Sequence, residues 1–212
     1  MTNAQLQRSL IRSHAAGMGA PVEREVVRAL MFLRLKTLAS GRTGVRPVLV
    51  ENMAALLNAG ITPVVHEFGS LGCSGDLAPL SHCAMVLMGE GRATGPDGVE
   101  RDSAELLAAA GIEPVILEAK EGLALINGTD GMLGQLCMAI LDLEELCDIA
   151  DVTGAMSVEA LLGTDRVFMP ELHMDLRPHP GQALSAARML AALANSPIVA
   201  SHREGDDRVQ DA

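Results

Sequence analysis

The chain has 212 residues, 49% of them hydrophobic, and its 16 basic and 27 acidic side chains give a formal net charge of −11. This charge disfavours binding to nucleic acids and to anionic membranes, because both need clustered Lys and Arg. There is no Trp or Tyr and only three Phe, so stacking on bases is disfavoured too. A core of Leu, Ala, Val and 12 Met suits packed helices better than a β-sandwich, and we expect a mostly α fold.

The four cysteines are Cys73, Cys83, Cys137 and Cys147, and none belongs to a C-x-x-C pair. A zinc site is therefore not expected, and the six histidines show no ligand spacing either. A chain of this size and apolar content needs no disulfides, so we interpret the cysteines as reduced thiols of a cytoplasmic protein. The N-terminus does not resemble a signal peptide, and no run of about 18 apolar residues predicts a membrane span.

Helical periodicity dominates the chain. In chain order, the apolar spacing and the turn residues predict helices over 22–39, 45–58, 76–89, 103–110, 129–151 and 182–194, an extended segment over 61–68 and a small hairpin-like insertion over 89–102. Between the extended segment and the third helix, residues 69–75 hold three glycines and two serines, which is typical of a loop. Asp76 follows that loop as a predicted helix N-cap or first-turn acid.

The longest predicted helix, about 129–151, carries an apolar seam with coiled-coil-like spacing. Its members are Leu133, Leu136, Ile140, Leu143, Cys147 and Ala150. Acidic residues of the same helix lie off this seam, and we interpret them as a solvated face rather than as a charged site. The chain shows no internal repeat and no linker, so we expect a single mostly helical unit over 1–212.

The glycine-rich segments do not match the common nucleotide or hydrolase motifs. The tripeptide Cys73-Ser74-Gly75 nevertheless allows distinctive chemistry. Gly75 has no Cβ, so its backbone nitrogen can approach the carbonyl carbon of Cys73 and close a five-membered ring with loss of water. Loss of a second water from Ser74 leaves an exocyclic methylene, which is an electrophile. A flexible connector before an Asp-capped helix is the structural alternative.

The segment around this tripeptide, Gly69–Gly91, closely resembles the signature of the aromatic amino acid ammonia-lyases. Three further segments agree with that family in order and spacing: Ser13-His-Ala-Ala-Gly17, Lys120-Glu-Gly-Leu-Ala-Leu-Ile-Asn-Gly-Thr129 and Ser201-His-Arg-Glu…Arg208-Val-Gln-Asp211. The resemblance covers essentially the whole chain and implies a helical lyase fold. It also implies that Cys73, Ser74 and Gly75 form 4-methylidene-imidazol-5-one (MIO), without a metal or a diffusible cofactor. The family has Ala where this chain has Cys73, but only the backbone carbonyl of that residue enters the ring.

The resemblance assigns roles to four further residues, each of which also has a structural alternative. His14, in the pair Ser13-His14, resembles the selectivity residue of members that act on histidine, and is otherwise a helix-end histidine bonded to backbone. Asn127 resembles the asparagine that contacts MIO and the substrate, and is otherwise a turn residue. Gln210 resembles a pocket glutamine, although a chain end is often disordered. Asp76 resembles the acid that assists ring closure, and helix capping is compatible with that role.

These residues imply an ammonia-lyase that converts L-histidine to urocanate non-oxidatively. The family is homotetrameric, with active sites shared between subunits. A lyase or aminomutase acting on tyrosine or phenylalanine is the nearest alternative, and a non-catalytic helical oligomerisation fragment is another. Family chains are more than twice as long and place catalytic tyrosines outside the matched segments, whereas this chain has no tyrosine. We therefore expect an internal fragment of a longer lyase chain that is not competent alone.

Overall fold

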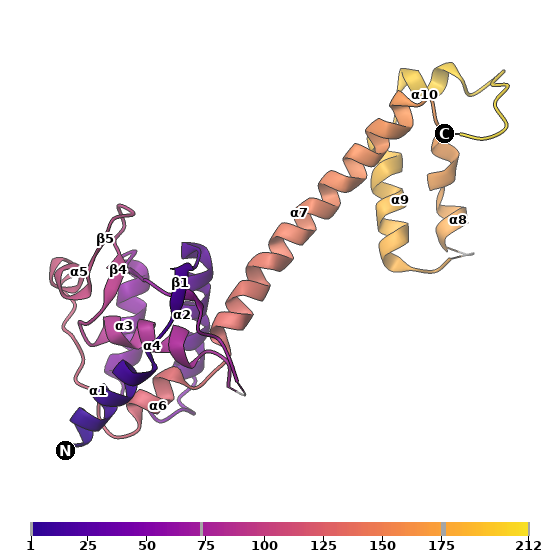
Figure 1. Ribbon diagram of the computed structural model, residues 1–212. Helices are drawn as coiled ribbons and strands as arrows, with labels where there is room; N and C mark the ends of the chain where they lie inside the picture. Colours follow the sequence, from indigo (N-terminus) through magenta and orange to yellow (C-terminus); the bar gives the residue numbers. More distant parts are fainter. Residues whose placement is uncertain (1, 73, 175–176, 212) are drawn as a thin grey trace. The chain divides into compact units, whose positions relative to one another are not determined.

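The computed structural model describes residues 2–72, 74–174 and 177–211 (Figure 1). The sequence suggested one unit over 1–212, whereas the structure forms two compact units, Met1–Ala139 and Ile140–Ala212. Residues 141–150 of the long helix are exposed at every position, so this stretch contributes little to either core.

The first unit is a bundle of helices with two small sheets (Figure 1). Its helices are α1 (Asn3–His14), α2 (Arg24–Ala39), α3 (Pro47–Asn58), α4 (Leu77–Leu87), α5 (Ser103–Ala110), α6 (Glu121–Ile126) and the first part of α7 (Asp130–Ala160). In one sheet β1 (Met18–Pro21) pairs antiparallel with β3 (His66–Phe68); in the other the order is β2 (Thr62–Pro63), β4 (Arg92–Thr94), β5 (Glu100–Asp102). Buried side chains of α1 to α6 form one continuous hydrophobic core.

Local sequence signals account for most of these boundaries. Pro47 starts α3 at a position where its missing N–H costs nothing, and Gly111 ends α5 in the left-handed conformation, with φ +66°. The hairpin-like insertion is confirmed: β4 and β5 pair antiparallel around the turn at Gly98. Helix α1 was not predicted, although Thr2 and Gln5 form a capping box at its start.

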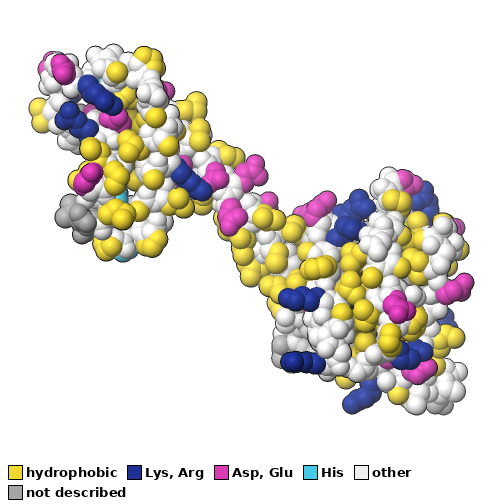
Figure 2. Space-filling view, turned by 180° about the vertical axis from the view of Figure 1, so that it is seen from behind, with side chains coloured by type: hydrophobic (Ala, Val, Ile, Leu, Met, Phe, Trp, Pro, Cys, Tyr) yellow, Lys and Arg dark blue, Asp and Glu magenta, His cyan; other side chains and the backbone are white. Residues whose placement is uncertain are grey.

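Helix α7 extends beyond its predicted end, to Ala160, and Gly154 lies within it. Leu162, two residues after the helix, adopts the left-handed conformation. The predicted seam is not buried within the chain. Leu133, Leu136, Ile140 and Leu143 are all exposed, Leu143 at 57%. Figure 2 shows hydrophobic side chains along this exposed helix, interrupted by acidic ones. The seam spacing therefore marks an apolar face that the described residues of the chain leave largely exposed.

By length and composition, the segment Glu121–Ala160 also meets the criteria for a membrane-spanning helix, which the sequence analysis did not expect. Charged residues interrupt this segment, so it contains no uninterrupted apolar run of about 18 residues. Asp142, Glu144, Glu145 and Asp148 lie in the second half of this segment. Ionised side chains are costly in a bilayer, so these acids favour a helix that packs against protein and water.

The second unit contains the remainder of α7 and short helices that fold back along it. They are η1 (Asp165–Phe168), α8 (Pro170–Met174), α9 (Pro180–Ala192) and α10 (Pro197–Ser201). Ala155, Leu193 and Val199 form its small core. Asp151 of α7 is buried and accepts a hydrogen bond from Ser185 Oγ of α9, and Arg188 lies beside it at 3.7 Å. These contacts join α9 to α7.

Candidate functional site

The glycine-rich loop before α4 closes on itself. The Leu71 N–H donates to the Gly75 carbonyl at 2.9 Å, and Gly72 and Gly75 adopt left-handed φ values of +78° and +77°. The left-handed backbone at Gly75 favours glycine, because L side chains rarely adopt this conformation, and a Cβ there would also displace the Cε of Met132. Cys73, the first residue of the proposed ring, lies outside the described residues. Ser74 and Gly75 are described, and they lie in a tight turn.

Asp76 fixes this loop to the start of α7. Its side chain is fully buried, and Oδ2 accepts from the backbone N–H groups of Gly131 at 2.8 Å and Met132 at 3.0 Å. Its own N–H donates to the Gly128 carbonyl at 3.1 Å. The sequence predicted that Asp76 caps the helix it precedes, but its side chain makes no capping bond to α4. It caps α7 instead, 55 residues along the chain, where the helix dipole favours a carboxylate.

The second carboxylate oxygen of Asp76 is buried and has no hydrogen-bond partner among the described residues. A buried, unpaired carboxylate oxygen is costly, so it indicates a group that meets a partner during function or folding. Asp76 directly follows Gly75, whose N–H must lose its proton for a ring to close. The orphaned oxygen therefore fits the residue set expected around an MIO-forming tripeptide.

Asn127 lies at the opposite side of this junction, at the C-terminal end of α6. Its side chain is exposed, and its backbone carbonyl accepts from Arg34 Nη2 at 3.3 Å. Gly128 follows, and its carbonyl is the acceptor for the Asp76 N–H described above. The structure therefore brings the loop at 69–76 and the turn at 127–132 together, as a joint site requires.

His14 ends α1 and lines a pocket of about 480 Å³ with Gly69, Ser70 and Leu71 of the loop and Leu77 of α4. This volume lies within the range of about 300–1,000 Å³ that is common for small-molecule sites. The Nδ1 atom of His14 lies 2.9 Å from the Leu10 carbonyl, as the structural alternative anticipated. Nδ1 also lies 3.0 Å from Ser13 Oγ. When Nδ1 donates to the carbonyl, the neutral ring presents Nε2 as an acceptor. The backbone contact thus leaves His14 able to bind a ligand.

His66 and His82, which were not predicted as site residues, hold the segment after His14. The Gly17 N–H donates to His82 Nε2 at 3.1 Å, and His66 packs edge-on against His82 with ring centroids 5.4 Å apart. Burial, with a smaller contribution from the charge of His66, lowers the pKa of His82 below its ordinary value. His82 is thereby kept neutral, as an acceptor must be.

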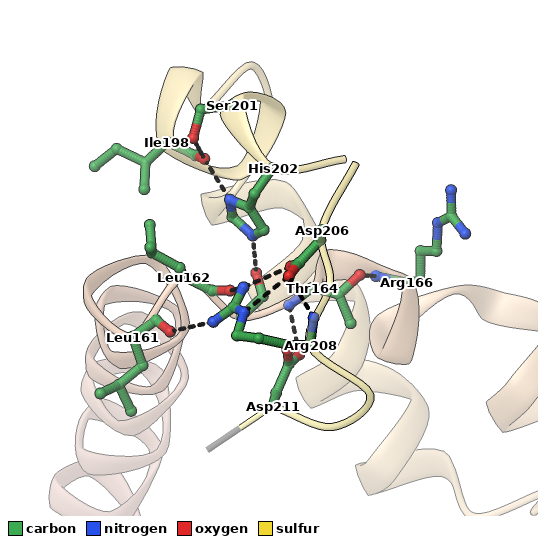
Figure 3. Close-up of polar contacts among 11 residues, drawn as sticks. Leu161, Leu162, Thr164, Arg166, Ile198, Ser201, His202, Asp206, Arg208 and Asp211 are labelled. Carbon is green, nitrogen blue, oxygen red and sulfur yellow. Dashed lines mark hydrogen bonds and ion pairs between the residues drawn. The ribbon is translucent and has the colours of Figure 1, made fainter. Parts of the chain in front are cut away.

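Gln210 belongs to the second unit and is exposed. It lines a separate pocket of about 540 Å³ together with His202 and Arg208. Figure 3 shows how the surrounding chain is held: Arg208 points at the carbonyls of Leu161 and Leu162, at the end of α7, and pairs with Asp206. The structure therefore does not include Gln210 in the unit that contains the loop, Asp76, Asn127 and His14.

Arg34, which was not predicted as a site residue, lies at the centre of the contacts behind Asn127. The side chain is 3% exposed and pairs with Asp130. The sequence does contain a signal for this residue, because Arg34 lies at helical spacing from Leu30 and Leu38 on the buried face of α2. A charged residue on an apolar helix face requires a buried partner, but the sequence did not indicate which one.

Comparison with known proteins identifies the class. A model of the aromatic amino acid lyase family matches residues 2–212. The chain is 68% identical to the histidine ammonia-lyase of Streptomyces avermitilis, over 99% of this chain and 41% of that protein. It is equally similar to the enzyme of the same name from Streptomyces coelicolor, over 98% of this chain and 40% of that protein. The chain thus spans about two fifths of the length of these relatives.

Solved structures of similar proteins support the same family. The histidine ammonia-lyase of Trypanosoma cruzi superposes with a TM-score of 0.82 at 39% identity, over 89% of this chain and 37% of that one. The tyrosine aminomutase of Streptomyces globisporus superposes with a TM-score of 0.86 at 40% identity, over 99% of this chain and 41% of that one. The predicted helical lyase fold is confirmed, and the chain belongs to the aromatic amino acid lyase family.

Proposed function

We propose that this chain is part of an ammonia-lyase that eliminates ammonia from L-histidine to form urocanate. The observation that carries the proposal is the junction at Asp76, where the glycine-rich loop docks on the start of α7 beside the pocket of His14. The high identity to relatives named histidine ammonia-lyase supports histidine as the substrate. The similarity to a tyrosine aminomutase keeps tyrosine as the nearest alternative.

The proposal includes an MIO group formed from Cys73, Ser74 and Gly75. The Gly75 nitrogen attacks the Cys73 carbonyl carbon, and one water leaves as the ring closes. A second water leaves from the Cα and Cβ of Ser74. Asp76 directly follows Gly75 in the chain, and its unpaired oxygen would accept the proton from the Gly75 N–H. When formed, the group supplies an electrophile that makes the substrate amine a better leaving group.

We assign the binding and orientation of the substrate to side chains of this chain. His14 would accept a hydrogen bond from the substrate imidazole through Nε2, which a Phe at this position could not do. Asn127 would bind the amino-acid end of the substrate, and Gln210 would line the pocket in the assembled enzyme. We further propose a cytoplasmic homotetramer in which the exposed apolar face of α7 packs against other subunits.

The substrate is tested in an extended chain, defined here as this sequence completed by the remaining segments of the Streptomyces avermitilis relative. Ammonia release is compared for L-histidine, L-tyrosine and L-phenylalanine at equal concentrations. We expect turnover of histidine alone, with urocanate as the product. Turnover of tyrosine but not histidine would overturn the proposed substrate.

The prosthetic group is tested by intact mass. In the extended chain the mass should fall by two waters relative to the sequence, and Ser74→Ala should abolish this loss. Asp76→Asn keeps an oxygen that can cap α7 but removes the carboxylate, so it should fold and retain the unmodified mass. Ser81→Ala, in α4 and outside the loop, is a control that should still lose two waters. An unmodified mass in the folded wild-type protein would contradict MIO formation.

A further inference from the structure

Arg34 of α2 is a buried cation whose partners all belong to one short segment. Its side chain is 3% exposed and lies among core residues of α2. Nη1 donates to the Ala124 carbonyl at 3.2 Å, and Nη2 donates to the Asn127 carbonyl at 3.3 Å and to the Asp130 carboxylate. Nε is buried without a hydrogen-bond partner among the described residues, so the bonds of Nη1 and Nη2 are what offsets the cost of burying this guanidinium.

These partners span the last turn of α6, the Asn127 turn and the first residue of α7. A guanidinium is planar, so its two terminal nitrogens fix the spacing between the carbonyls that they bind. Gly128 is adapted to this arrangement, because a Cβ there would overlap Arg34 Nη2. On the other side, Asp76 binds Gly128, Gly131 and Met132 as described above. The turn that carries Asn127 is therefore held from behind by Arg34 and linked in front to the loop.

We infer that Arg34 is a positioning residue, which holds the backbone of Asn127 so that the exposed amide side chain meets the substrate. This inference rests on the proposed function of Asn127. Arg34 acts through the turn, since it is buried and its contacts are with backbone carbonyls and Asp130 rather than with the pocket of His14. A displacement of a binding group by about 1 Å can cost about 100-fold in rate.

A double-mutant cycle in the extended chain tests this link. Arg34→Met should lower kcat/KM for L-histidine by at least about tenfold, mainly through KM, and Asn127→Ala should have a comparable effect. The double variant should be no worse than Asn127→Ala, because Arg34 has nothing left to position. Independent effects that multiply in the double variant would show a merely structural role and overturn the inference.

Hydrogen exchange of the 212-residue chain provides a readout that does not depend on activity. Arg34→Met should accelerate exchange of the amides from Asn127 to Met132. Arg28→Met is the matched control, because Arg28 also lies on α2 but donates to the Leu57 carbonyl, and it should leave these amides unchanged. If the methionine variant does not fold, Arg34→Lys retains the charge beside Asp130 without the planar pair of donors and should loosen the same amides. Unchanged exchange there would contradict the inference, whereas an inactive wild-type extended chain would contradict only the proposed function.

Discussion

His14 shows how one side chain can satisfy both of the interpretations drawn from the sequence. Its Nδ1 donates to the Leu10 carbonyl, as in an ordinary helix-end histidine, and this bond leaves Nε2 as the acceptor. In the extended chain, His14→Leu should lower kcat/KM for L-histidine by up to about tenfold, the cost of one neutral hydrogen bond. Thermal unfolding should shift little, because the ring is only partly buried. Unchanged turnover of histidine, alongside an inactive Asn127→Ala variant, would assign His14 a structural role only.

His82 makes the stability of the first unit depend on pH, and substituting this residue isolates its contribution. Burial lowers its pKa in the folded state, so folding favours the neutral ring, and protonation would also remove the acceptor for the Gly17 N–H. This stabilisation is complete above the ordinary histidine pKa and is lost as the pH falls below it. Urea unfolding of wild type and His82→Gln at a series of pH values should show a steeper loss in wild type as the pH falls below about 6.5. Parallel curves would contradict this prediction.

At the scale of elements, α6 is held at both ends by arginines. Arg34 binds its C-terminal end, and Arg46, which precedes α3, binds the buried Glu121 at its start through two bonds of 2.8 Å. Burial alone would raise the pKa of Glu121, but the hydrogen bonds from Arg46 and from the Glu118 N–H, together with the charge of Arg46, outweigh it and hold that pKa below its ordinary value. A helix of this length is marginal without tertiary contacts, so these pairs position it and hence Asn127.

Arg46 also allows a matched comparison of a buried and an exposed partner. Glu121 is 3% exposed, whereas Glu118, which binds the same guanidinium at 2.8 Å, is 66% exposed. Glu121→Ala should lower the free energy of unfolding by about 2–4 kcal/mol, because it removes the buried partner of Arg46 and leaves the backbone N–H groups of Arg46 and Glu118 without their acceptor. Glu118→Ala should cost less than about 1 kcal/mol. Urea denaturation of the 212-residue chain measures both, and equal losses would show that burial does not decide the strength of these pairs.

At the scale of the whole molecule, the composition of the chain limits what it can catalyse. An electrophile activates the leaving amine, but the weakly acidic β-proton also needs a positioned base. By resemblance that base is a tyrosine, and the 212 residues contain none. The purified 212-residue chain should therefore form no measurable urocanate from L-histidine, while the extended chain does. Comparable turnover by the two proteins would contradict both this prediction and the need for a tyrosine base.

Much of the local structure followed from the sequence by itself. Helix α5 and the hairpin at 92–102 appear where periodicity and turn residues predicted them, because both depend on neighbours a few residues apart. The glycine loop and the tripeptide were also recognisable locally, and the ordered motifs were sufficient to identify the family. α1 was missed although its capping box is local, so that signal was available in the sequence.

Only the tertiary structure decided which distant groups meet. Asp76 lies where a helix cap was predicted, but its carboxylate caps α7, 55 residues away, because the loop turns it from its own helix. The seam of α7 has the spacing of a buried helix and is nevertheless exposed, since spacing determines which residues share a face and not what covers that face. The charge of Arg34 on an apolar face called for a partner, but the choice of Asp130, 96 residues away, depends on how α2 packs against α6 and α7. Periodicity is set by contacts within one element, whereas the site is assembled from contacts between elements.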